Sequence, residues 1–152
     1  MTAPFYSRGG ARSYAKVGLE TSVNTASPEK LIALLFDGAR AAITRARHAL
    51  EQKDIAARGM AIGKAIAIVS DGLKAALDRD RGGQVASNLY ELYDYVERCL
   101  LSANLHADLG KLDEADRLLG EVAGAWKEMM EGRAPGVAAQ AGTSTASIRV
   151  AS

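Results

Sequence analysis

Few residues of this 152-residue chain could do chemistry, and they are scattered: two histidines and one cysteine. Di-iron sites in helical bundles use a Glu-x-x-His pattern, but neither His48 nor His106 follows a glutamate by three positions. His106 and Asp108 are close in sequence, yet no further ligands at zinc spacing join them. We therefore predict neither a metal centre nor a cofactor.

The single cysteine does not indicate catalysis either. Cys99 falls on the apolar stripe of a predicted helix, and a buried thiol in apolar surroundings is a poor nucleophile. A lone cysteine cannot form an internal disulfide, which suits a reducing compartment. The stretch "DRDRGGQ" lacks the Gly-Lys-Ser/Thr ending of a phosphate-binding loop. The sequence therefore favours a protein that is not an enzyme.

One enzyme-like alternative remains, a histidine phosphotransfer domain, which is also a four-helix bundle. His48 lies off the apolar stripe of its helix and is flanked by Arg45 and Arg47. Such sites usually have a small residue one turn away, whereas Thr44 and Gln52 occupy those positions here. An ordinary surface histidine is the simpler interpretation. A helical adaptor with a different client is a further alternative.

The helices that would position any site are clear from the apolar periodicity. Ser27, Pro28 and Glu29 form a well-defined helix start: a capping hydroxyl, a proline suited to the first turn and an acid at the positive end of the dipole. Apolar residues then recur at steps of three and four in four stretches. The four stripes are Leu31, Leu35, Ala39, Ala42, Ala46 and Ala49; Ile55, Gly59, Ile62, Ile66, Val69, Leu73 and Ala76; Val85, Leu89, Leu92, Val96, Cys99 and Ala103; and Leu112, Ala115, Leu119, Val122, Trp126 and Met129.

Short breaks at residues 52–54, 78–83 and 106–110 separate the four stretches. Because short connections make neighbouring helices antiparallel, we predict an all-α, up-down-up-down four-helix bundle over residues 25–131. Residues 1–24 are weakly patterned, so we expect a mobile N-terminal arm with room for a short extra helix near residues 13–19. Residues 132–152 lack apolar periodicity, and we expect a disordered tail.

Charge and hydropathy exclude several classes of partner. The 19 basic and 18 acidic residues are interspersed and give a net charge of +1, so nucleic acid is not expected as a partner. No stretch resembles a signal peptide or reaches the roughly 20 apolar residues that span a bilayer. We expect a cytoplasmic protein that does not insert into membranes, as a monomer or weak dimer.

Some apolar side chains are left over outside the predicted core. On the third helix, Tyr90, Leu101 and Leu105 lie off the stripe and Tyr93 lies at its edge. On the second helix, Ile68 faces away from the stripe, and antiparallel pairing places it roughly opposite Tyr90 and Asp94. These positions predict an apolar groove between the second and third helices, which would suit an amphipathic client helix.

The chain resembles the flagellar secretion chaperone FliS family from about Tyr6 to Trp126. The resemblance rests on five pieces in order: "FYSRGGARSYAKVGLET", "TASPEKLIALLFDGARAAITRA", "IGKAIAIVSDGLKAALD", "GGQVASNLYELYDYVERCLLSAN" and "EVAGAWKEMM". Each piece alone is weak, but their order and spacing are specific. One departure is Phe36, where the family more often has tyrosine.

The resemblance implies an export chaperone that binds the disordered C-terminal segment of flagellin. It would prevent premature polymerisation and, as a complex with flagellin, reach components of the flagellar type III export gate. The resemblance further implies that the arm tyrosines, Tyr6 and Tyr14, lie on the bundle and compete with the client. Tyr93, Asp94 and Asn104 match the family's "YDY…AN" pattern; Asn104 would bond either to a client backbone or to the end of its own helix.

Overall fold

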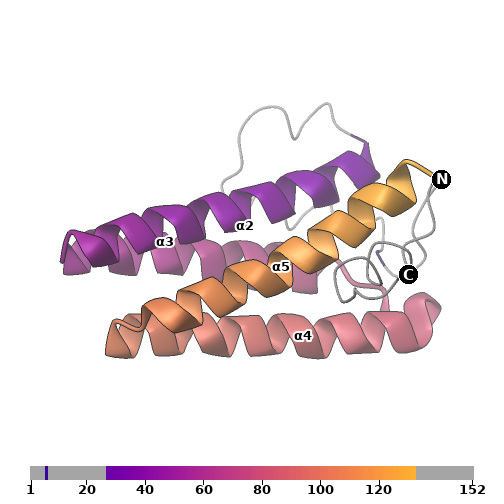
Figure 1. Ribbon diagram of the computed structural model, residues 1–152. Coiled ribbons are helices and arrows are strands. Elements are labelled where there is room, and N and C mark those ends of the chain that lie inside the picture. The colour runs from indigo at the N-terminus through magenta and orange to yellow at the C-terminus, as the bar shows by residue number, and fades with distance from the viewer. Residues whose placement is uncertain (1–5, 7–26, 133–152) are drawn as a thin grey trace, which may run out of the picture.

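The computed structural model describes Tyr6 and residues 27–132, which form four antiparallel helical rods (Figure 1). Helix α2 spans Pro28–Glu51, α3 spans Ile55–Ala67 and continues directly into the π-helix η3 at Ile68–Lys74, α4 spans Arg79–His106 and α5 spans Leu109–Met130. The predicted all-α four-helix bundle is confirmed. Among the described residues, β pairing is limited to one antiparallel bridge between Tyr6 and Leu77.

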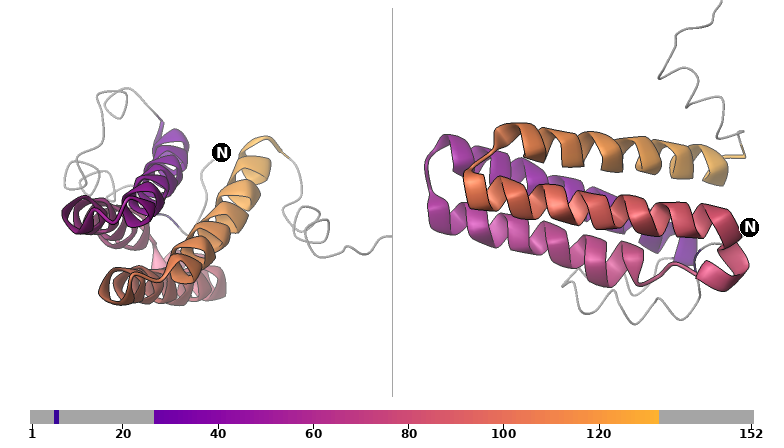
Figure 2. Two further views of the ribbon diagram at one scale, coloured as in Figure 1. Left: turned by 60° about the vertical axis from the view of Figure 1, so that its left-hand side comes forward. Right: turned by 90° about the horizontal axis from the view of Figure 1, so that it is seen from below.

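The four rods close into a ring. Each packs against the next along the chain, and α5 returns to α2, as Figure 1 shows. In Figure 2 (left), the first turn of α2 and the last turn of α5 lie at the same end of the bundle. We call this end the open end. None of the described helices is long and apolar enough to cross a membrane.

A side-chain cap starts each helix that follows a break. Ser27, Asp54, Asp78 and Asp108 each accept a hydrogen bond from the backbone N–H three residues later. These bonds satisfy donors that the first turn of a helix leaves without partners. The predicted cap at Ser27 is confirmed. The predicted break at 78–83 is too long, because α4 begins at Arg79 and is interrupted only at Gly83, whose φ of 56° favours glycine.

The core follows the predicted stripes closely on α2 and less closely on α4. Every stripe residue of α2 is buried, and so are Ile32, Phe36 and Ile43 beside it. On α4 the prediction is wrong at Val85, which is exposed near the Gly83 interruption at the end of the bundle. Ile55 is likewise exposed, because it occupies the first position of α3 at the opposite end.

The π-helix η3 corrects the predicted position of Ile68. Its side chain is fully buried, with 0% exposure, rather than facing away from the core. The reason is that η3 packs against both α2 and α4, so its buried sector is wider than a single stripe. Gly72 in η3 lies against Leu35: a Cβ atom added there would meet a Leu35 methyl group at 2.8 Å.

Candidate functional site

An apolar cavity of about 450 Å³ lies between α4 and α5 at the open end of the bundle. Its lining comes from three helices and from Tyr6, which belongs to none of them. The lining residues are Tyr6, Phe36, Val85, Leu89, Glu121, Val122, Ala125, Trp126 and Met129. We call this cavity the Tyr6 pocket. An apolar hollow of this size suits apolar side chains of another segment better than a polar small molecule.

Three contacts hold Tyr6 in place at the wall of this pocket. Its hydroxyl oxygen lies 2.6 Å from the hydroxyl oxygen of Tyr93 on α4. Its ring meets the ring of Trp126 on α5 edge-on, with centroids 5.5 Å apart and planes at 84°. Its backbone bridges to Leu77, between η3 and α4. A single residue from the N-terminal region therefore joins parts of the bundle that are far apart in sequence.

Tyr93 lies behind Tyr6 and is fully buried, with 0% exposure. Its ring packs at a tilt against Phe36, with centroids 6.4 Å apart. Burial raises the pKa of the Tyr93 hydroxyl, although the hydrogen bond with Tyr6 acts in the opposite direction. Tyr93 is therefore neutral and can both donate and accept a hydrogen bond. The prediction that it lies at the edge of the core is wrong: it belongs to the core.

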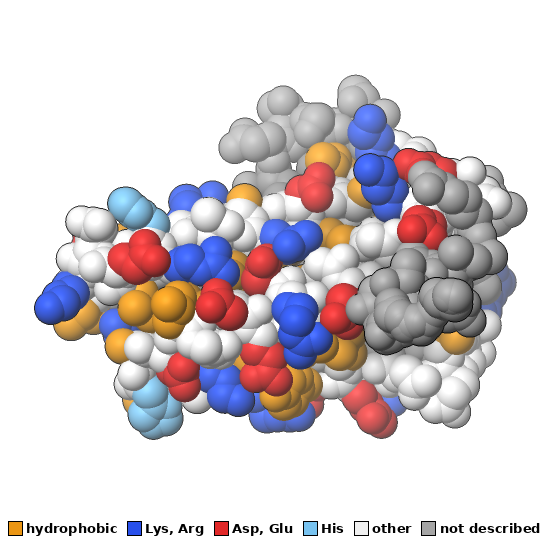
Figure 3. Space-filling model, viewed as in Figure 1, with side chains coloured by type: hydrophobic (Ala, Val, Ile, Leu, Met, Phe, Trp, Pro, Cys, Tyr) orange, Lys and Arg blue, Asp and Glu red, His pale blue; other side chains and the backbone are white. Residues whose placement is uncertain are grey.

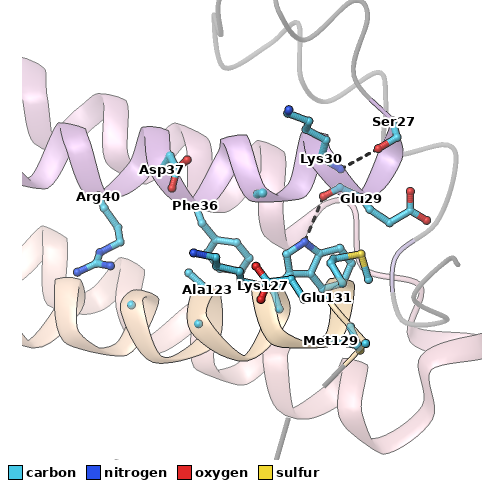
Figure 4. Close-up of a pocket in the computed structure, with 16 residues that line it drawn as sticks. Ser27, Glu29, Lys30, Phe36, Asp37, Arg40, Ala123, Lys127, Met129 and Glu131 are labelled. Carbon is cyan, nitrogen blue, oxygen red and sulfur yellow. Dashed lines mark hydrogen bonds between the residues drawn. The ribbon is translucent and has the colours of Figure 1, made fainter. Parts of the chain in front are cut away.

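A second, larger cleft of about 910 Å³ runs between α2 and α5 at the same end. Phe36, Trp126 and Met129 line both hollows and so form the wall that they share. Figure 4 shows Phe36 pointing from α2 toward α5. The indole N–H of Trp126 donates to the backbone oxygen of Glu29 at 3.1 Å, which fixes the wall to the first turn of α2. On the α5 side, the small residues Gly120, Ala123 and Gly124 leave the space of the cleft unfilled.

Charged pairs close the seam between α2 and α5 beyond this cleft. Arg40 donates to Asp116 at 2.8 Å, and Arg47 pairs with Asp113 farther from the open end. The bond to Asp116 raises the pKa of the Arg40 guanidinium, although burial lowers it. The predicted mixing of charges is visible in Figure 3, where blue and red side chains alternate over this face.

The predicted groove between the second and third helices is largely filled by a charged cluster. The ring of Tyr90 lies between two cations, with Lys74 Nζ at 5.1 Å and Arg79 Cζ at 4.3 Å from its centroid. Lys74 also pairs with Asp94 at 3.3 Å and with Glu97 at 2.9 Å. The bond from Lys74 lowers the pKa of Asp94. These contacts hold η3 against α4 and place charged groups where the sequence predicted an apolar groove.

The other predicted residues lie apart from the Tyr6 pocket. Leu101 and Leu105 are 58% and 78% exposed on the outer face of α4. Asn104 accepts a hydrogen bond from Arg58 Nε at 3.2 Å, and its backbone oxygen accepts another from the same guanidinium at 2.9 Å. Asn104 thus ties α4 to α3, a role that sequence reasoning did not consider. Tyr14 lies outside the described residues.

Sequence reasoning identified Tyr6 and Tyr93 but missed the aromatic and methionine walls around them. Trp126, Val122 and Met129 were assigned to the core stripe of the last helix, and Phe36 was noted only as a departure from the family. A usable signal was present: Phe36 and Trp126 are large aromatic residues on the buried faces of the first and last helices.

The residues tested for chemistry show no catalytic arrangement. Among Tyr6 and residues 27–132, no three histidine, cysteine, aspartate or glutamate side chains gather as a metal ion would need. Cys99 is buried, and burial raises the pKa of its thiol. His48 is exposed in the last turn of α2, and His106 is exposed at the end of α4.

The fold and the pocket define the class: a four-helix bundle with an apolar cavity at one end, one wall of which is an aromatic side chain from outside the four helices. The chain belongs to the FliS family, since the family model of flagellar protein FliS matches residues 10–133. The resemblance seen in the sequence is confirmed.

Characterised relatives of the chain share this family name. It is 50% identical over 124 residues to the flagellar secretion chaperone FliS of Salmonella typhimurium, covering 82% of this chain and 92% of the relative. It is 41% identical over 121 residues to the flagellar secretion chaperone FliSB of Pseudomonas aeruginosa, covering 80% and 95%. It is 36% identical over 125 residues to the flagellar secretion chaperone FliS of Escherichia coli, covering 82% and 92%.

Proposed function

We propose that this protein is a cytoplasmic, non-enzymatic flagellar export chaperone. Its client is the disordered C-terminal segment of flagellin. By covering the apolar face that this segment presents once helical, the protein prevents premature polymerisation. The complex with flagellin is then the form that reaches the flagellar type III export gate.

The observation that carries this proposal is the Tyr6 pocket. Its other walls belong to the bundle, but Tyr6 comes from the N-terminal region and can leave without unfolding α2, α3, α4 or α5. The vacated space would expose the rings of Phe36 and Trp126 beside an already apolar cavity. An apolar segment of a client can take the same place, and burial of its side chains supplies the driving force.

Competition with Tyr6 lowers the affinity for the client and so keeps such binding reversible. A tethered arm competes at an effective concentration of roughly millimolar, so a client must bind the pocket better than the arm does. The apparent affinity for the client falls in proportion to the fraction of chains in which Tyr6 has left its place. The client also bears the entropy cost of ordering when it binds. Capture and release therefore need no chemical step.

The direct test is calorimetric titration of the full chain with a peptide from the C-terminal segment of flagellin. We expect saturable one-to-one binding with a negative heat-capacity change, the signature of apolar burial. Met129→Asp places a charge in the shared wall of both hollows and should weaken binding by at least about tenfold, or about 1.4 kcal/mol. Met60→Asp is the matched control, because Met60 is 79% exposed on α3 and lines neither hollow.

Two further variants, Leu101→Asp and Leu105→Asp, ask whether the client reaches the two leucines that the sequence assigned to the client site. Absence of binding by a chain shown to be folded would contradict the proposal. Phosphate uptake on His48, lost in His48→Gln, would then support the phosphotransfer alternative. Equal loss of binding in Met129→Asp and Met60→Asp would show that the Tyr6 pocket is not the client site.

A further inference from the structure

The Tyr93 hydroxyl is a polar group buried in an otherwise apolar part of the core. Tyr93 has 0% exposure, and the tilted ring of Phe36 packs against it. Within the described part of the chain, the hydroxyl of Tyr6 is the hydrogen-bond partner of this group. Tyr6 lines the pocket and Tyr93 does not, so Tyr6 stands between the cavity and the buried hydroxyl.

The state of this hydroxyl depends on what occupies the place of Tyr6. With Tyr6 in place, the Tyr93 hydroxyl has a hydrogen-bond partner, the hydroxyl oxygen of Tyr6 at 2.6 Å. With the place empty, water can enter and bond to it. An apolar client side chain would expel that water and leave the hydroxyl buried without a partner, which costs the desolvation penalty of the group.

We propose that the segment replacing Tyr6 must supply a hydroxyl of its own to Tyr93, so that Tyr93 selects clients with serine, threonine or tyrosine at the anchor position. The inference rests on the proposed function and adds the chemistry that the client must bring. Sites built to bond a ligand hydroxyl reject analogues that lack it far more strongly than apolar pockets reject an extra methylene. Phe36 and Trp126 still provide most of the contact area, but they do not distinguish one apolar side chain from another.

The recognition differs from that of a simple apolar groove in a measurable way. In a groove without Tyr93, replacing a client hydroxyl residue by alanine or valine would be neutral or favourable. With Tyr93 present, one such replacement should weaken binding by about tenfold. A loss of this size lies in the lower half of the usual cost of leaving a buried polar group without a partner. The penalty should vanish when Tyr93 loses its own hydroxyl.

The experiment is a double-mutant cycle on full chains carrying Tyr6→Ala, which frees the pocket. The Tyr6→Ala chain and the Tyr6→Ala/Tyr93→Phe chain are each titrated with the C-terminal flagellin peptide. Both are also titrated with peptides that lose one hydroxyl each, by change of a serine or threonine to alanine or of a tyrosine to phenylalanine. We expect Tyr93→Phe to weaken the parent peptide about tenfold. We expect one peptide change to weaken binding to the Tyr93 chain while having little effect on the Tyr93→Phe chain.

Tyr95→Phe is the matched control, since it removes a hydroxyl from the same helix where that hydroxyl bonds to Glu114 outside the pocket. Equal or tighter binding of the parent peptide to the Tyr93→Phe chain would overturn the inference and leave the proposed function intact. Absence of binding to every chain would overturn both. If Tyr93→Phe fails to fold, the Tyr93 chain still tests the inference, because binding that no single loss of a peptide hydroxyl weakens would overturn it.

Discussion

At the scale of single residues, two glycines on one rod have opposite surroundings. A Cβ at Gly72 would lie 2.8 Å from the buried side chain of Leu35, whereas a Cβ at Gly63 would meet nothing within 4 Å. Gly72→Ala should therefore lower the free energy of unfolding by about 1–3 kcal/mol through overpacking. Gly63→Ala should raise it by about 0.5–1 kcal/mol, because alanine favours the helix. Urea denaturation measures both, and changes of the same sign would contradict the packing described here.

Glu114 makes a second residue-scale prediction, about acid stability. The hydroxyl of Tyr95 and the ammonium of Lys111 donate to its carboxylate and lower its pKa from the ordinary 4.5. Because the folded state favours the charged form, this contribution is present above pH 4.5 and is lost as the pH falls through the lowered pKa.

Glu114→Gln should therefore flatten the decline in stability below pH 4.5, measured by urea denaturation at a series of pH values. Tyr95→Phe should flatten it partly, since it removes one of the two donors. An acid decline that stays as steep in Glu114→Gln as in the parent chain would show that Glu114 does not contribute to it.

At the scale of elements, the caps determine where the helices begin. Asp108 accepts from the backbone N–H of Lys111 at 3.3 Å and starts α5, whose far end forms a wall of the pocket. Asp108→Ala should cost about 1 kcal/mol of stability, and Asp108→Asn should retain most of it, because asparagine caps equally well. Thermal denaturation compares the two. An equal loss in both variants would assign the effect to charge rather than to capping.

The elements also show which parts of the fold the sequence could predict. The cap at Ser27 was recognisable because Pro28 and Glu29 follow it. The caps at Asp54 and Asp78 lie within segments assigned only as breaks. Periodicity placed the α2 stripe correctly. It failed at Ile68, because η3 contacts two neighbouring helices and because a π-helix is not visible in three-four spacing.

At the scale of the whole molecule, both hollows lie at the end of the bundle where α2 begins and α5 ends. Ion pairs of Arg40 and Arg47 join α2 to α5 along the rest of their seam. The charged cluster around Lys74 fixes η3 against α4. The framework is therefore firmly joined around a site whose occupant, Tyr6, comes from outside it.

The candidate site was only partly predictable for the same reason. The resemblance pointed to Tyr6 and Tyr93, but periodicity placed the apolar groove between the second and third helices. The structure places the Tyr6 pocket between α4 and α5, with a wall from α2. Its position depends on how α2, α4 and α5, which are far apart in sequence, pack at one end of the bundle. That is a property of tertiary packing, which no pattern within a single helix encodes.

The central claim, that Tyr6 occupies the client site, is tested most directly by comparing the affinity of the full chain and of Tyr6→Ala for the C-terminal flagellin peptide. If Tyr6 and the client compete, removing the side chain should tighten binding by at least about fivefold, mainly through faster association with an unfilled pocket. Tyr6→Phe should fall between the two, since it keeps the contact with Trp126 and loses the bond to Tyr93. Affinity that is unchanged or weaker in Tyr6→Ala would contradict the account and place the client elsewhere on the bundle.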